Sequence, residues 1–201
     1  MCKWEKVKEC GQLQVTRCDN DMPFEVTARL QCGNMAYFAL LRLLTSRLVS
    51  RKMKLRIYNT VIRLVYGCET WSLTVRYQKR LLVFEKRVLR CILGPVWDPV
   101  LGRPRQRSNR DIRNLCEQPW ITGVVKSRRL QWAGHVVLAP VERAIVTAMN
   151  GQVNAVRPLG RPRKRWSGSV REDAQRLGVG DWRRAVLNRV NWKAAIRLQV
   201  L

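Results

Sequence analysis

Apolar residues recur every three or four positions along most of the chain, which is the spacing of one buried face on an α-helix. The first such stretch covers residues 27–49, the second 50–66 and the third 77–93. Ser50 is a suitable N-cap for the second helix, and Gly94 with the proline after it ends the third. Amphipathic helices joined by short connections predict a small helical bundle over residues 27–94.

The same spacing returns after residues 95–118, a linker rich in proline and arginine in which Asn109 is placed to cap a short helix. A helix is expected over residues 120–138. Further helix signals follow, namely a Ser-x-x-Glu capping box at Ser169, a closing glycine at Gly178 and an N-cap at Asp181. The prediction is an all-α fold, with the small bundle followed by a basic, partly disordered linker and a second helical subdomain over residues 119–201.

The charge of the chain indicates a more specific property than the helical pattern does, namely binding to polyanions. The chain has 201 residues, with 39 Lys and Arg against 14 Asp and Glu, and a formal net charge of +25. Residues 1–26 carry a net charge of −1, so the excess belongs to the rest of the chain and residues 1–26 form an atypical N-terminal segment. Nucleic acid is the expected partner of so basic a protein, and an anionic membrane surface is the competing one.

Candidate chemistry is sparse. The seven cysteines contain no CxxC pair and His135 is the one histidine, so no zinc-ligand set is indicated and the thiols are expected to be reduced. The carboxylates do not cluster as two-metal chemistry requires. We therefore expect no catalytic residue, metal, cofactor or small-molecule substrate. The chain contains neither a signal peptide nor an apolar stretch long enough to span a bilayer, so we expect an intracellular, nuclear protein without a membrane partner.

The most basic and least helical stretch is residues 157–168, an Arg-rich loop that begins RPLGRPRKRW. Glycine and proline keep this backbone extended, which leaves open three interpretations: contact with a phosphate backbone, insertion into a minor groove, and a solvated linker. Its part LGRPR also occurs at residues 101–105. Trp166 borders the loop and is the tryptophan best placed to stack on a base, whereas Trp71, Trp132 and Trp192 are expected in the core.

An ordered series of segments resembles the C-terminal part of the endonuclease–reverse transcriptases of non-LTR retrotransposons. The series begins at residues 19–22 and continues with AYFALLRLLTSRLVSRKMKLRIYNTVIRLVYGCETWSLT (36–74), LLVFEKRVLRCILGPV (81–96), SRRLQWAGHVV (127–137), GRPRKRW (160–166) and a last stretch at 170–182. The resemblance implies that residues 36–93 match the helices of a polymerase thumb, within the bundle expected over residues 27–94. It implies that residues 127–182 match a basic region that holds nucleic acid, within residues 119–201. Residues 1–18 and 97–107 depart from the family pattern.

The family's polymerase aspartates and its endonuclease domain match nothing in this chain, so the resemblance implies a non-catalytic binder of RNA, DNA or an RNA–DNA hybrid. Its expected contacts are Arg42, Arg47, Arg51, Lys52 and Lys54 in the thumb-like bundle, and Arg157, Arg161, Arg163, Lys164, Arg165 and Trp166 in the loop. Two alternatives remain open. The chain is part of a polymerase whose active site lies on missing sequence, or it is a decayed reading frame without function.

Overall fold

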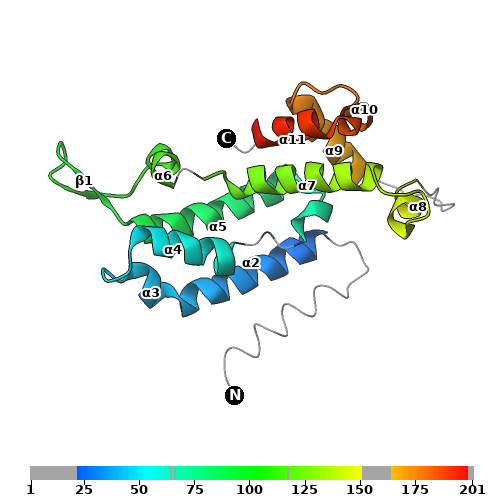
Figure 1. Cartoon of the computed structure of the whole chain (residues 1–201). Helices are drawn as coiled ribbons and strands as arrows, with labels where there is room; N and C mark the ends of the chain where they lie inside the picture. The colour runs from blue at the N-terminus through cyan, green and yellow to red at the C-terminus, as the bar shows by residue number, and fades with distance from the viewer. Residues whose placement is uncertain (1–21, 64, 66, 117, 151–163, 199–201) are drawn as a thin grey trace, which may run out of the picture. The chain divides into compact units, whose positions relative to one another are not determined.

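The computed structural model describes residues 22–63, 65, 67–116, 118–150 and 164–198 (Figure 1). It divides into two compact units, which are described separately. The first unit takes its described residues from Met1–Tyr66 and Val75–Thr122, and the second from Gly67–Thr74 and Gly123–Leu201. Residues 67–74, which lie within the range expected for the first bundle, are thus part of the second unit.

The first unit is built from helices, as the apolar spacing predicts. Its elements are α2 (Met22–Ala39), α3 (Leu41–Thr45), α4 (Arg51–Ile57), the π-helix η1 (Tyr58–Ile62), α5 (Val75–Leu93) and α6 (Asn109–Cys116). Helix α5 packs against α2, α3, α4 and α6. Val26, Leu44, Leu81, Val88 and Ile112 are buried along these helices. The apolar faces that the sequence shows therefore meet in one core.

A β-hairpin stands within the range expected to be a linker, and it is the one sheet in the described part of the chain. Strand β1 (Val96–Asp98) pairs antiparallel with β2 (Arg103–Arg105), with Trp97 opposite Pro104. Gly102, in the connecting turn, has a φ of 59°, a left-handed conformation that glycine adopts without steric cost. With this exception the fold is helical, and the predicted all-α class is confirmed.

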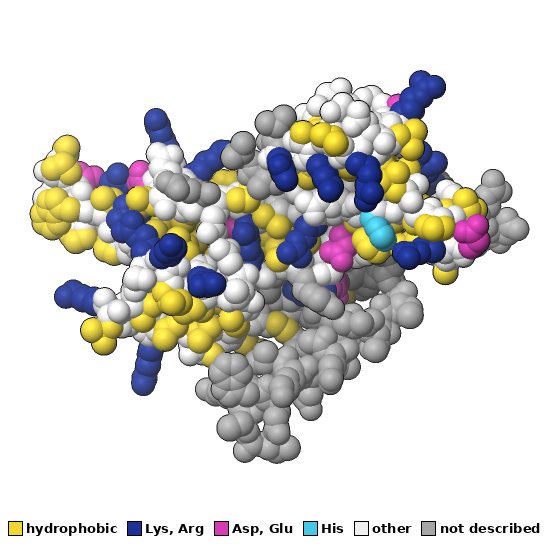
Figure 2. Space-filling view, in the orientation of Figure 1, with side chains coloured by type: hydrophobic (Ala, Val, Ile, Leu, Met, Phe, Trp, Pro, Cys, Tyr) yellow, Lys and Arg dark blue, Asp and Glu magenta, His cyan; other side chains and the backbone are white. Residues whose placement is uncertain are grey.

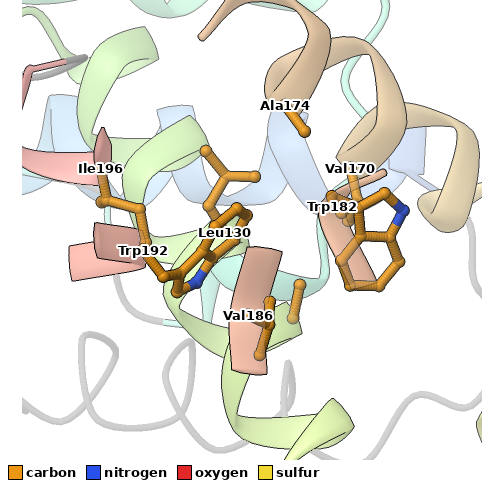
Figure 3. Close-up of a cluster of buried hydrophobic side chains, with 8 residues drawn as sticks. Leu130, Val170, Ala174, Trp182, Val186, Trp192 and Ile196 are labelled. Carbon is orange, nitrogen blue, oxygen red and sulfur yellow. The ribbon is translucent and has the colours of Figure 1, made fainter. Parts of the chain in front are cut away.

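The second unit contains the short 3₁₀ helix η2 (Cys68–Thr70), most of α7 (Ile121–Val137), α8 (Ala144–Asn150), α9 (Trp166–Arg176), α10 (Trp182–Leu187) and α11 (Arg189–Leu198). Its core joins α7, α9, α10 and α11. Figure 3 shows Leu130 beside Trp192, with Trp182 against Val170. Trp71 and Trp192 are buried as predicted, whereas Trp132 is only half-buried and stacks on His135, with ring centroids 5.3 Å apart.

The helix ends show which local signals the fold uses. Ser50 caps α4 by accepting the Met53 N–H, and Asp181 caps α10 by accepting those of Arg183 and Arg184, as predicted. At α6 the cap is Ser108 instead of the expected Asn109, because the Ser108 hydroxyl accepts the Asp111 N–H and the Asp111 carboxylate accepts the Ser108 N–H.

Other local predictions are wrong. The stretch 27–49 is not one helix, because the chain turns at Leu40 between α2 and α3 and Ser46 closes a turn by accepting the Leu48 N–H. Ser169 does not open α9, which begins at Trp166, and lies buried inside it. Cys68, Cys91 and Cys116 are free thiols, but Cys32 is disulfide-bonded, so the expectation of uniformly reduced thiols fails there. Disulfide formation depends on distance in the fold, which cysteine spacing does not reveal.

Candidate nucleic-acid interface

The cations predicted in the first unit do not share one environment. Arg42 on α3, Arg47 in the following loop, and Arg51 and Lys52 in the first turn of α4 are all exposed. Lys54, by contrast, is buried, with only 8% of its surface exposed. The four exposed side chains remain available to a ligand, whereas the ammonium-bearing side chain of Lys54 lies within the packing of the unit.

The predicted Arg-rich loop is described only at its end. Arg157, Arg161 and Arg163 lie outside the described residues. Arg165 is exposed, and the Lys164 ammonium forms an ion pair of 2.6 Å with the Glu172 carboxylate. The charge of Lys164 is thereby partly offset by an acid of α9.

Trp166 has a structural function in the second unit. Its indole N–H donates to the Glu69 carbonyl oxygen at 2.7 Å, and its ring packs against the core of α7, α9, α10 and α11. This places α9 against the segment that contains η2. Base stacking by Trp166 stays a prediction. The one hydrogen-bond donor of its side chain already bonds to the Glu69 carbonyl inside the protein.

A basic groove, hereafter the α2/α5 groove, lies between α2 and α5 in the first unit. Its volume is about 780 Å³, and apolar side chains including Leu30, Val83 and Phe84 form part of its lining. Its charged lining residues are all cationic: Arg76, Lys79, Arg80 and Arg87. Positive charge beside an apolar surface suits a ligand that combines phosphates with flat apolar rings.

Helical geometry explains why these cations lie together. Lys79 and Arg80 follow Arg76 by three and four residues, and Arg87 follows them by eight and seven, so the four side chains share one face of α5. Arg80 donates to the Thr27 hydroxyl of α2 at 3.1 Å. The Arg87 guanidinium lies 5.7 Å from the centre of the Tyr37 ring and 5.6 Å from that of Phe38. Contacts of this kind hold part of the basic lining against α2.

The acid of α5 points the other way. Glu85 is 1% exposed, and its carboxylate accepts hydrogen bonds from the Tyr58 hydroxyl at 3.0 Å and the Ile121 N–H at 2.8 Å. An Arg63 nitrogen lies 3.6 Å from the same carboxylate. Burial raises the pKa of Glu85, although these hydrogen bonds and Arg63 oppose it, and burial raises the pKa of Tyr58 well above its usual value. Helix α5 thus buries its acid, while four of its cations line the groove.

The second unit has a smaller basic cluster where α7 meets α9. Burial, followed by the nearby charge of Arg176, lowers the pKa of Lys126, and Lys164 contributes in the same direction. Asp173 opposes this shift. Because α7 supplies Lys126 and α9 supplies Arg176, the cluster depends on the packing of two helices that lie far apart in the sequence. Neighbouring cations that repel one another favour a bound anion.

Sequence reasoning did not select the groove cations. The sequence did contain a signal for them. Cations recur at three- and four-residue spacing within residues 76–87, and the one acid of this stretch falls on the other helical face. Figure 2 shows Lys and Arg side chains on both units, where they are not gathered in one patch. In the described part of the first unit, positive charge and a concave surface coincide at the α2/α5 groove.

The described residues contain no group of His, Cys, Asp and Glu able to hold a metal ion. His135 is exposed and stacks on Trp132. Among the same residues, none of the helices combines the length and apolarity needed to cross a membrane.

Comparison with known proteins gives one informative similarity. No protein-family model and no solved structure matches the chain. The chain is 26% identical over 161 residues to the putative uncharacterized transposon-derived protein F52C9.6 of Caenorhabditis elegans. The matched region covers 76% of this chain but 57% of the relative, so the chain spans little more than half of that protein's length. The similarity relates the chain to a transposon-derived protein.

Proposed function

We propose that the chain is a transposable-element remnant that binds nucleic acid without catalysing a reaction. The observation that carries this proposal is the α2/α5 groove, whose charged lining is entirely cationic. The net charge of +25 supports it, because a body so charged attracts polyanions over long range. The similarity to a transposon-derived protein supports the mobile-element origin. A nuclear location would bring the chain to its ligand.

The finer origin that we propose is the thumb and downstream basic region of a non-LTR retrotransposon reverse transcriptase. Its support is the ordered resemblance of segments from residue 19 to residue 182. Residues 36–74 and 81–96 of that series include the end of α2, all of α3 and α4, and most of α5. Of the groove cations, Arg87 lies in the second segment, whereas Arg76, Lys79 and Arg80 lie between the two segments. In this proposal the groove contacts phosphates, and the polymerase active site is on sequence that the chain lacks.

The first prediction concerns the groove cations. Replacing Arg76 and Lys79 together by Gln should weaken binding to single-stranded RNA or DNA, because two phosphate contacts are lost. For a single strand, the slope of log affinity against log salt should become shallower by about 0.7 for each lost contact. Fluorescence anisotropy of a labelled oligonucleotide, titrated at several salt concentrations, measures both quantities.

Two matched variants test whether the position of the charge matters. Lys193→Gln with Arg197→Gln removes two exposed cations of α11, and Arg51→Gln with Lys52→Gln removes two exposed cations of α4. All three double variants lower the net charge equally. If all of them weaken binding alike, the ligand responds to overall charge and the groove is not its site. A wild-type affinity that does not change with salt contradicts nucleic-acid binding itself.

A further inference from the structure

The β1–β2 hairpin has a rigid base on the first unit. The Arg107 side chain donates to the Gly94 carbonyl at 3.0 Å, and the Arg90 side chain donates to the Arg107 carbonyl at 3.2 Å and to the Asn109 side chain at 2.8 Å. These contacts link both ends of the hairpin to the end of α5. Its position relative to the helices of the first unit is therefore fixed by side-chain hydrogen bonds as well as by the chain.

The turn of the hairpin is also held. One oxygen of the Asp98 carboxylate accepts the Val100 N–H at 3.0 Å and the Leu101 N–H at 3.3 Å, an arrangement typical of an Asx turn. The other oxygen pairs with Arg105 at 3.2 Å, and Arg105 also reaches Asp111 at 3.3 Å. Arg105 therefore contacts both acids near the hairpin and offsets part of their charge.

The side chains at the tip are apolar and exposed. Trp97 is 63% exposed, Val100 91% and Leu101 55%. Trp97 lies opposite Pro104 in the register, so the two side chains share one face of the ribbon, whereas Asp98 and Arg103 share the other. Hydrophobic side chains gather at the hairpin end in Figure 2. Strand β1 and the turn held by Asp98 thus present Trp97, Val100 and Leu101 to solvent.

Charge identifies the occupant that this tip fits. Residues 99–110 contain Arg103, Arg105, Arg107 and Arg110 and no acid. Apolar side chains that project beyond a row of arginines are complementary to a nucleic acid. The apolar side chains can contact the stacked bases, and the arginines can contact the phosphate backbone that surrounds them. Proteins that kink nucleic acids insert apolar wedges between base steps in this way, and aromatic rings stack on exposed bases.

We propose that the hairpin is a wedge whose apolar tip inserts at an opened base step while the exposed Arg103 and Arg110 contact the flanking phosphates. This inference rests on the proposed nucleic-acid binding and adds a preference for nucleic acid with unpaired bases. Inserting a wedge costs less where a step is already unpaired. The chain should therefore bind a duplex with a central mismatch more tightly than the same duplex fully paired.

The test compares these two duplexes, each with 2-aminopurine beside the central step, using the full chain. The wild type should bind the mismatched duplex about tenfold more tightly and should change the 2-aminopurine fluorescence. Trp97→Ser combined with Leu101→Ser should abolish both effects and leave affinity for the paired duplex within about twofold. Val141→Ser is the matched control, because Val141 is 76% exposed in a turn of the second unit.

The possible results distinguish failure of the wedge from failure of nucleic-acid binding. If the tip variant keeps the mismatch preference and the fluorescence change, the wedge is wrong even though nucleic-acid binding stands. If the tip variant loses binding to phosphatidylserine vesicles and nothing else, the tip serves a membrane surface and the wedge is likewise wrong. If the wild type binds neither duplex at any salt concentration, the proposed function fails. Thermal unfolding of the tip variant should match that of the wild type, because the replaced side chains are exposed.

Discussion

Gly134 of α7 shows how one missing side chain shapes the second unit. A Cβ at this position would lie 2.7 Å from the Trp192 indole nitrogen and 3.1 Å from the neighbouring ring carbon. That nitrogen is buried without a hydrogen-bond partner among the described residues. Close packing of α7 against the tryptophan of α11 therefore requires glycine, although glycine lowers helix stability by about 0.5–1 kcal/mol relative to alanine.

Gly134→Ala should consequently destabilise the second unit. The clash with a buried ring typically costs about 1–3 kcal/mol, which exceeds the gain in helix propensity. Chemical unfolding followed by circular dichroism measures the change in free energy. Gly168→Ala is the control, since Gly168 lies inside α9 with nothing within 4 Å of its Cβ position, and this variant should unfold like the wild type or slightly later. Equal stability of both variants would show that Trp192 moves aside freely.

Arg129 of α7 connects secondary-structure elements in the second unit. Its side chain is 5% exposed, forms a short ion pair with Asp173 of α9 and donates to the Trp71 carbonyl at 2.6 Å. Residues 67–74 and α9 are thereby attached to one arginine. The contact joins three stretches of the family resemblance, those that contain GCETW, SRRLQW and VRED. It gives a structural reason for these segments to occur together.

Arg129→Met should cost about 3–5 kcal/mol of folding free energy, because it leaves the buried Asp173 carboxylate without its partner. Adding Asp173→Leu should recover much of the loss by removing that charge, and the double-mutant cycle in chemical unfolding measures the coupling. A cost below about 1 kcal/mol for Arg129→Met would show that water replaces the guanidinium, and that the arginine does not hold these elements.

The charge of the protein also acts on its stability as a whole. With 39 cationic and 14 anionic side chains, the folded protein repels itself at low ionic strength. The cations around Lys126 are a local example of this repulsion, since burial is the main cause that lowers the pKa of that lysine and the charges of Arg176 and Lys164 lower it further. Anions that gather on the folded protein should therefore stabilise it.

The melting temperature should rise when sodium chloride is increased from about 10 to 150 mM, because screening shortens the Debye length from about 30 to about 8 Å. Polyphosphate at constant ionic strength should raise it further if multivalent anions bind the folded form. Differential scanning fluorimetry measures both effects, with neutral polyethylene glycol as the control. A melting temperature that falls with salt would mean that attractive ion pairs outweigh the repulsion.

Local sequence signals predicted a good part of the fold. The spacing of apolar residues gave helices in both units, and the limits of α5 and α7 lie within about two residues of the predicted ones. The caps at Ser50 and Asp181 and the left-handed glycines at Gly94 and Gly178 also agree. These features are encoded within a few residues of one another, so the sequence alone contains them.

Features that depend on contacts between distant residues could not be read in this way. Ser169 resembles a cap, yet α9 begins earlier because Trp166 bonds to the Glu69 carbonyl and packs on the core. Lys54 has the charge of a binding residue but is buried, and Cys32 forms a disulfide that spacing does not indicate. The choice among exposed cations likewise requires the three-dimensional arrangement.

The sequence by itself established the helical class and the cationic excess after residue 26, because period and composition are properties of the chain. The resemblance to a mobile-element family rests separately on the order of its matching segments. Only the tertiary structure determined where the cationic side chains line a concave surface. The groove exists because α2 packs beside the basic face of α5 while Glu85 is buried on the other side. The apolar hairpin tip exists because Asp98 holds the turn that exposes it.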